Sequence, residues 1–202
     1  AADNPPILRE LLGRPAAALE GRMETAYRQT VEGRRALDAL QRQYASHAQA
    51  ARDLRAAIRD LRKSSPWLNL DWDTDEADRA WEEAIRQERN AHVAHTFVQA
   101  LDELNKGVDA AERAEQLYAR VQRQMVSALR HLGDALRVLN RGIERRQRQA
   151  VQLRERGDAE AAARLEAECA RAEQAADLAQ GARAFEDALR YLRDANNALG
   201  VG

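Results

Sequence analysis

The sequence is poor in several residue types that constrain a fold. It has one cysteine and four prolines in 202 residues, only 4% of its residues are aromatic, and lysine occurs only at Lys63 and Lys106. The lone Cys169 excludes an internal disulfide framework. No apolar run reaches the roughly 20 residues that a membrane-spanning helix needs. The last proline is Pro66, so the rest of the chain lacks the strongest helix breaker.

An excess of charge of one sign is also missing. The chain carries 32 Lys and Arg against 33 Asp and Glu, a net charge of −1. A balanced chain exerts little long-range attraction on nucleic acid, so we expect no nucleic-acid partner. The use of Arg over Lys is a bacterial-type composition, and we favour a cytoplasmic location over a periplasmic or secreted one.

Motifs of catalysis are absent as well. The sequence has no glycine-rich phosphate loop, no nucleophile elbow, and no Ser, His and Asp that helical periodicity would bring together. We therefore expect that the protein is not an enzyme and has no catalytic residues.

What the chain has in abundance is the material of long helices. Hydrophobic residues make up 45% and charged residues 32% of the sequence. Ala, Glu, Leu, Arg and Gln dominate, which is typical of coiled coils. Aromatic residues are too few for a thick core, so we expect thin apolar seams along rods. The predicted fold class is all-α, an elongated antiparallel coiled coil or helical bundle of three to four long helices plus a short N-terminal helix.

One periodic pattern runs through residues 19–61. Its inward positions alternate in steps of four and three over about six heptads, which predicts left-handed supercoiling against another helix. A homodimer is the expected assembly, because a second copy often completes a seam this long and thin. The seam positions are Leu19, Met23, Ala26, Thr30, Gly33, Leu37, Leu40, Tyr44, His47, Ala51, Leu54, Ile58 and Leu61.

Helix-start and helix-stop residues divide the N-terminal part of the chain. Asn4 and the prolines after it suit a helix start and Gly13 suits a helix end, so residues 1–14 are predicted to form a short capped helix. Pro15 then opens a longer helix. That helix is expected to end before Pro66, because the residue preceding a proline is disfavoured in the helical region.

Two helical hairpins are predicted to follow. Gly157–Asp158 predicts a tight turn, with Gly as the stop and Asp as the N-cap of a last helix that runs to about Leu199. The apolar seam of that helix includes Phe185 and Cys169, which is expected to be an inert core thiol. At residues 105–107 the sequence leaves open whether the helix continues or breaks. The predicted domains are the short helix at 1–14, a first hairpin at 15–105 with a Trp-rich loop at 64–75, and a second hairpin at 106–202 with its turn at 157–158.

Three of the four histidines are predicted to converge. If the chain folds back at Pro66, the numbers of facing residues sum to about 138, which puts His47 near a helix face carrying Glu88, His92 and His95. Imidazole and carboxylate groups bind Zn²⁺ and other divalent metals. These four residues are the candidate metal site, and no other cofactor is expected. The alternative is a polar layer that sets helix register.

Two further groups of residues are candidate interaction sites. The loop residues Trp67, Leu68, Leu70 and Trp72 either cap the hairpin end or form a docking loop for a partner, because exposed aromatic residues are usually functional. Arginines that outnumber nearby acids form a candidate anion-binding patch; the alternative is a solvated helix face. This patch comprises Arg141, Arg145, Arg146 and Arg148.

The function favoured by these patterns is a non-enzymatic coiled-coil scaffold or oligomerisation module, binding itself and a further protein. An alternative follows from layout. A short N-terminal helix, a long hairpin and further helices resemble, in helix lengths alone, phage-shock protein A and its relatives, and more loosely BAR domains. That resemblance implies a peripheral membrane-remodelling or membrane-stress protein that binds a membrane surface. A divalent-metal-binding helical protein is the second alternative.

Overall fold

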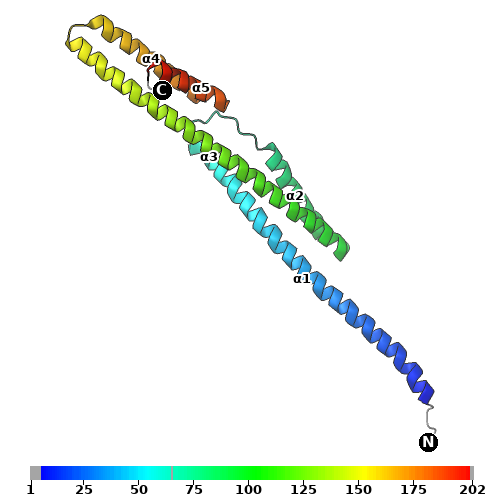
Figure 1. Ribbon diagram of the computed structural model, residues 1–202. Coiled ribbons are helices and arrows are strands. Elements are labelled where there is room, and N and C mark those ends of the chain that lie inside the picture. The colour runs from blue at the N-terminus through cyan, green and yellow to red at the C-terminus, as the bar shows by residue number, and fades with distance from the viewer. Residues whose placement is uncertain (1–5, 65, 201–202) are drawn as a thin grey trace. The chain divides into compact units, whose positions relative to one another are not determined.

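A computed structural model describes residues 6–64 and 66–200, with the backbone alone at residues 6–21, 23–25, 27–28 and 64. The protein is all-helical, with 88% helix and no strand in the part that is described, which confirms the all-α class. Its helices are α1 Pro6–Ser64, α2 Asp75–Val93, α3 Phe97–Glu155, α4 Ala159–Gly181 and α5 Phe185–Ala198 (Figure 1).

Two predicted chain breaks are confirmed. α1 ends at Ser64, immediately before the Pro66 connection. The turn after α3 uses Gly157 at φ 86, a left-handed conformation that glycine adopts without strain. The Asp158 side chain then accepts a hydrogen bond of 3.1 Å from the Ala161 backbone N–H and caps α4.

The predicted separate helix at residues 1–14 is wrong in its end point. α1 is one helix from Pro6, and it continues through Gly13 and Pro15. A glycine inside a helix costs about 1 kcal/mol and an interior proline about 3 kcal/mol, although the φ of proline is itself helical. Two local breakers therefore do not outweigh the cooperativity of a 59-residue helix.

The sequence left open whether the helix breaks at residues 105–107, and it does not break there. α3 runs without interruption through Gly107, and the chain turns at residues 94–96 between α2 and α3. There the Thr96 hydroxyl accepts a hydrogen bond of 3.2 Å from the Gln99 N–H. This is the N-cap of α3, and Thr96 followed three residues later by Gln99 was the sequence signal for it.

The single last helix predicted as far as Leu199 is also wrong. The chain bends at residues 182–184, which separates α4 from α5. Ala182 is extended, with φ −67 and ψ 145, and directly follows Gly181. Glycine at the end of a helix was the available signal, and the surrounding alanines concealed it because they favour helix.

Residue contacts group the chain into two compact units. Unit 1 comprises Ala1–Gln49 and Arg79–Arg113, and unit 2 comprises Ala50–Asp78 and Ala114–Gly202. The three helices α1, α2 and α3 each contribute to both units. The predicted boundary between residues 105 and 106 therefore falls inside a continuous helix.

In unit 1, α1 packs against α2 and the beginning of α3. The Tyr44 hydroxyl donates a hydrogen bond of 3.4 Å to Glu88 Oε2. At the other end of the contact the Phe97 ring covers Gly33, where an added Cβ would collide with Phe97 Cε1. Residue numbers rise along α1 as they fall along α2, so these two helices are antiparallel.

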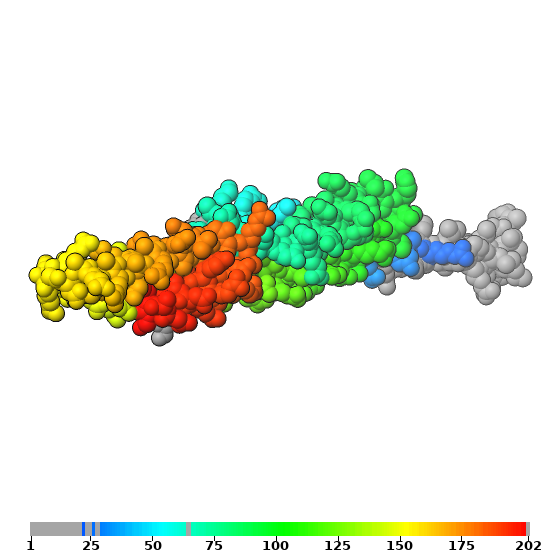
Figure 2. Space-filling view, turned by 90° about the horizontal axis from the view of Figure 1, so that it is seen from above, coloured from blue at the N-terminus to red at the C-terminus, as the bar shows by residue number. Residues whose placement is uncertain are grey.

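Unit 2 contains an extended core in which α4 and α5 lie along the C-terminal part of α3 (Figure 1). Figure 2 shows α4 in orange and α5 in red packed against each other. Small side chains on α4 permit this close approach. The core residues are Trp67, Leu70, Leu132, Leu139, Ile143, Cys169, Ala172, Ala176, Ala179, Ala188, Leu192, Ala195 and Leu199.

Polar contacts position the helices of unit 2. Asp78 accepts a hydrogen bond of 2.5 Å from the buried Tyr118 hydroxyl and lies 3.5 Å from Arg55 Nε, so it joins segments of α1, α2 and α3. The buried Asn196 donates a hydrogen bond of 3.2 Å from Nδ2 to the Ala135 carbonyl and holds α5 against α3. Directional contacts of this kind select one helix register among several of similar apolar burial.

Candidate functional site

The predicted metal ligands are not gathered into one set. His92 Nε2 lies 3.8 Å from Glu88 Oε1, but Glu88 also accepts the Tyr44 hydrogen bond. His95 is exposed and lies beyond the end of α2 at Val93, so the helical spacing that grouped it with His92 does not hold. Among side chains that the structure describes, no three of His, Cys, Asp and Glu are arranged to hold a metal ion. His47 lies half-buried on α1.

The Trp-rich loop is divided between core and surface. Trp67 and Leu70 are 3% and 6% exposed and belong to the unit 2 core, as the hairpin-cap interpretation predicts. Leu68 is 64% exposed, and Trp72 is half-buried. A partner-docking role therefore stays a prediction that depends on Leu68 and Trp72.

The four arginines of the candidate anion-binding patch also differ in burial and in their contacts. Half-buried Arg146 donates a hydrogen bond of 3.1 Å to the Leu199 carbonyl at the end of α5 and lies 3.8 Å from Glu168 Oε2. A cation at that position is favoured by the helix dipole, so Arg146 has a structural role. Arg148 lies 3.5 Å from Glu144 Oε2. Arg141 and Arg145 are exposed, and anion binding there stays a prediction.

The buried thiol of Cys169 is chemically quiet. It is 3% exposed and contacts the Ile143 carbonyl at 3.7 Å. Burial is the main cause that raises the pKa of the Cys169 thiol, and nearby carboxylates add to it. The reactive thiolate is therefore depleted at neutral pH, in agreement with an inert core cysteine.

One site that sequence reasoning missed lies where two connections of unit 2 meet. The Asp71 backbone N–H donates a hydrogen bond of 2.9 Å to the Arg183 carbonyl. This bond joins the connection before α2 to the connection between α4 and α5. Arg62 Nη2 donates a second hydrogen bond of 2.8 Å to the Trp72 carbonyl. The backbone on both sides of the Trp72 side chain is thus held in place.

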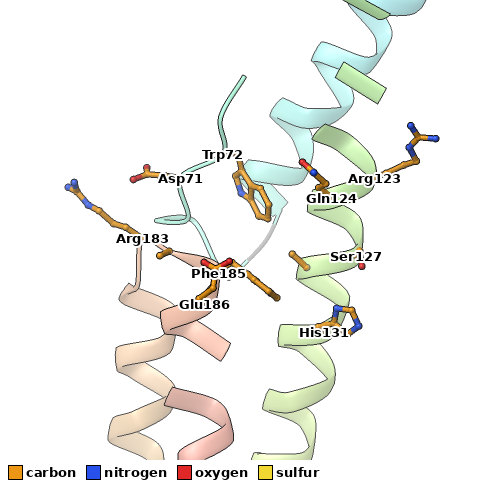
Figure 3. Close-up of a pocket in the computed structure, with 11 residues that line it drawn as sticks. Asp71, Trp72, Arg123, Gln124, Ser127, His131, Arg183, Phe185 and Glu186 are labelled. Carbon is orange, nitrogen blue, oxygen red and sulfur yellow. The ribbon is translucent and has the colours of Figure 1, made fainter. Parts of the chain in front are cut away.

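These connections and the facing part of α3 line an open pocket of about 840 Å³. The rings of Trp72 and Phe185 project into it, and the side chains of Arg123 and Arg183 extend away from it (Figure 3). Its lining residues are Asp71, Trp72, Arg123, Gln124, Ser127, Ala128, His131, Arg183, Ala184, Phe185 and Glu186. The volume lies within the range of small-molecule sites.

The sequence contained only a weak signal for this pocket. Phe185 is one of two phenylalanines in the chain, but an uninterrupted last helix assigned it to an apolar seam. Trp72 and Phe185 are 113 positions apart, and only the bend at residues 182–184 brings their connections together.

The comparisons with known proteins give no family for this chain. A scan of family models found no match, and neither did searches of curated proteins and of solved structures. In the described part of the chain, no helix is both long and apolar enough to cross a membrane.

Proposed function

We propose that this protein is a non-enzymatic coiled-coil scaffold that self-associates as a homodimer through the N-terminal part of α1. The observation that supports this most is a change in burial along one continuous seam. Ala26 and Thr30 are exposed, although they are in phase with the buried residues Tyr44, Ala51 and Ile58. When one heptad seam is buried in its later part and exposed in its first part, the exposed part is typically the surface that pairs with a further chain.

Two partly buried leucines also indicate that a single chain leaves this seam incomplete. Leu37 and Leu40 lie between the open and the buried parts of the seam, and both are only half-buried. Leucines at such positions of a complete coiled coil are normally enclosed by the facing helix. We define the N-terminal seam as the exposed positions Ala26 and Thr30; the next seam position, Gly33, is covered by Phe97 of the same chain.

An apolar surface adjoins this seam at the α2–α3 connection. Val93 and Val98 are 73% and 75% exposed, and Phe97, which covers Gly33, is 41% exposed. Contiguous exposed apolar groups mark interaction surfaces more often than isolated ones do. A second copy lying along the N-terminal seam would meet this surface at its edge.

The proposal is tested by measuring particle mass by light scattering on a sizing column over a range of protein concentrations. A dimer is expected, and Thr30→Glu should shift it toward monomer by at least about tenfold in dissociation constant, because like charges would face each other in the closed seam. Thr30 is exposed, so the change leaves the monomer intact.

Ala39→Glu is the matched control. It introduces the same charge at an exposed position nine residues later, about 180° around the helix and away from the seam. The dimer should survive this change. A wild-type monomer at all concentrations, or equal weakening by both variants, would refute the proposal.

The alternative function, binding to a membrane surface, is measured separately on the same purified protein. Co-sedimentation with anionic liposomes measures it directly, and the scaffold proposal predicts that the protein stays in the supernatant. Polymers that form only with liposomes would favour the membrane-remodelling function instead.

A further inference from the structure

The pocket between the two connections and α3 has the features of a prepared binding site. Trp72 is fixed by the Arg62 hydrogen bond to its own carbonyl and by the Asp71 hydrogen bond beside it. Phe185 begins α5, whose next turns are anchored in the core through Ala188 and Leu192. The backbone that carries each ring is therefore anchored, which reduces the entropy lost on binding.

The charges around the rings decide the kind of ligand. Arg123 and Arg183 extend away from the pocket, whereas Glu186 follows Phe185 and lies beside it (Figure 3). The positive end of the α5 dipole is offset by Glu186 and Asp187 in its first turn. What faces the cavity is two aromatic rings with a carboxylate near them.

Aromatic faces carry partial negative charge and attract cations, tryptophan most strongly. A carboxylate at the edge of such faces adds direct attraction for the same charge. Ala128, Ala184 and Ser127 contribute small neutral side chains that leave room for an apolar body, and the lining also includes Asp71 and His131. We propose that this pocket binds a small organic ammonium cation with an apolar body, held between Trp72 and Phe185 with its charge toward Glu186.

The test uses the full chain and three probes of similar size. Isothermal titration with benzyltrimethylammonium, benzyl alcohol and benzoate compares a cation, a neutral molecule and an anion that share one ring. The cation should bind at least about fivefold more tightly than benzyl alcohol, because the aromatic and carboxylate attractions act only on the charge. Benzoate should bind most weakly.

A spectroscopic readout locates the binding. The indole N–H signal of Trp72 should shift on addition of the cation, while the signals of Trp67 and Trp81, which are 3% and 8% exposed, should not. Trp72→Leu identifies the signal and keeps an apolar group in place. It should reduce the preference for the cation over benzyl alcohol.

A matched pair of charge variants tests the carboxylate. Glu186→Gln should weaken binding of the cation about threefold to fivefold, as for a partly exposed charge pair, and leave benzyl alcohol binding unchanged. Glu155→Gln removes an equal charge from an exposed site in the same unit and should change neither. Equal binding of benzoate and the cation, no shift of the Trp72 signal, or no effect of Glu186→Gln would overturn the proposal.

Arg62 is expected to act as a positioning residue. Arg62→Ala removes the hydrogen bond to the Trp72 carbonyl without removing any group from the pocket lining. Arg62→Ala should therefore weaken the binding of the cation and the binding of benzyl alcohol by the same factor. Weaker binding of the cation alone, with benzyl alcohol binding unchanged, would show that Arg62 does not act through Trp72.

Discussion

Replacing Gly107 by alanine tests whether α3 is a continuous helix at the point where the sequence allowed a hinge. Gly107 is buried, and an alanine Cβ there would lie 3.5 Å from Gln87 Cβ and 3.6 Å from Tyr44 Cδ2. These distances are ordinary van der Waals contacts. The structure thus has room for the methyl group without a shift of either neighbour.

The expected gain follows from two contributions. Alanine is favoured over glycine inside a helix by about 1 kcal/mol, and burying one methyl group adds up to about 0.8 kcal/mol. Gly107→Ala should therefore stabilise the protein by about 1–2 kcal/mol. In a chain of this length each 1 kcal/mol raises Tm by about 2–4 °C. Urea and thermal unfolding followed by circular dichroism at 222 nm measure both quantities.

Two other helical glycines provide the controls. An alanine Cβ at Gly133 meets nothing within 4 Å, so Gly133→Ala should gain the helix preference alone, about 1 kcal/mol. Gly33→Ala should gain less or lose stability, because its Cβ would collide with Phe97 Cε1. If Gly107→Ala destabilises the protein while Gly133→Ala stabilises it, α3 is not helical at residue 107 and the reasoning is refuted.

The remaining predictions concern the α3–α4 turn and the core of unit 2. Gly157→Ala should lose about 1–2 kcal/mol in urea unfolding, because Gly157 has φ 86 and alanine is strained there; unchanged stability would contradict the turn geometry. Leu192→Ala should lose about 2–5 kcal/mol, since Leu192 is 0% exposed. Val138→Ala, at a site 39% exposed, should change stability by no more than about 0.5 kcal/mol. Cys169 should react with a thiol reagent only after unfolding, and fast reaction of the native protein would refute its burial. Because folding raises the pKa of Cys169 above its ordinary value of 9.0, the unfolded thiol ionises first, and stability should be unaffected below that pH and fall above it. Cys169→Ala should abolish that part of the decline.

The helices were predictable wherever a signal acts within one turn. Pro66 ended α1, and Gly157 with Asp158 produced the turn and cap expected of them. The same local reasoning failed at Gly13 and Pro15, because the stability of a helix depends on its whole length and not on one residue. Local preference is a weak guide where neighbouring turns favour the helix strongly.

The candidate sites were predictable only in part. The grouping of His95 with His92 assumed an unbroken helix, and α2 ends between them at Val93. The assignment of Phe185 to a seam made the same assumption in α4 and α5. In both places one missed break changed which face a side chain occupies, because a helix rotates about 100° per residue.

The sequence by itself determined the helical class, the spacing of the long seam in α1 and the turns marked by proline or by glycine with aspartate. These properties depend on contacts within a few residues. The tertiary structure alone decided which part of that seam is buried, and it brought Trp72 and Phe185 to one pocket. Those outcomes depend on packing between segments distant in sequence, 44 positions apart for Tyr44 and Glu88 and 113 for Trp72 and Phe185. An apolar face has no preference for one apolar partner over another until shape and hydrogen bonds, such as that from Asn196 to the Ala135 carbonyl, select it.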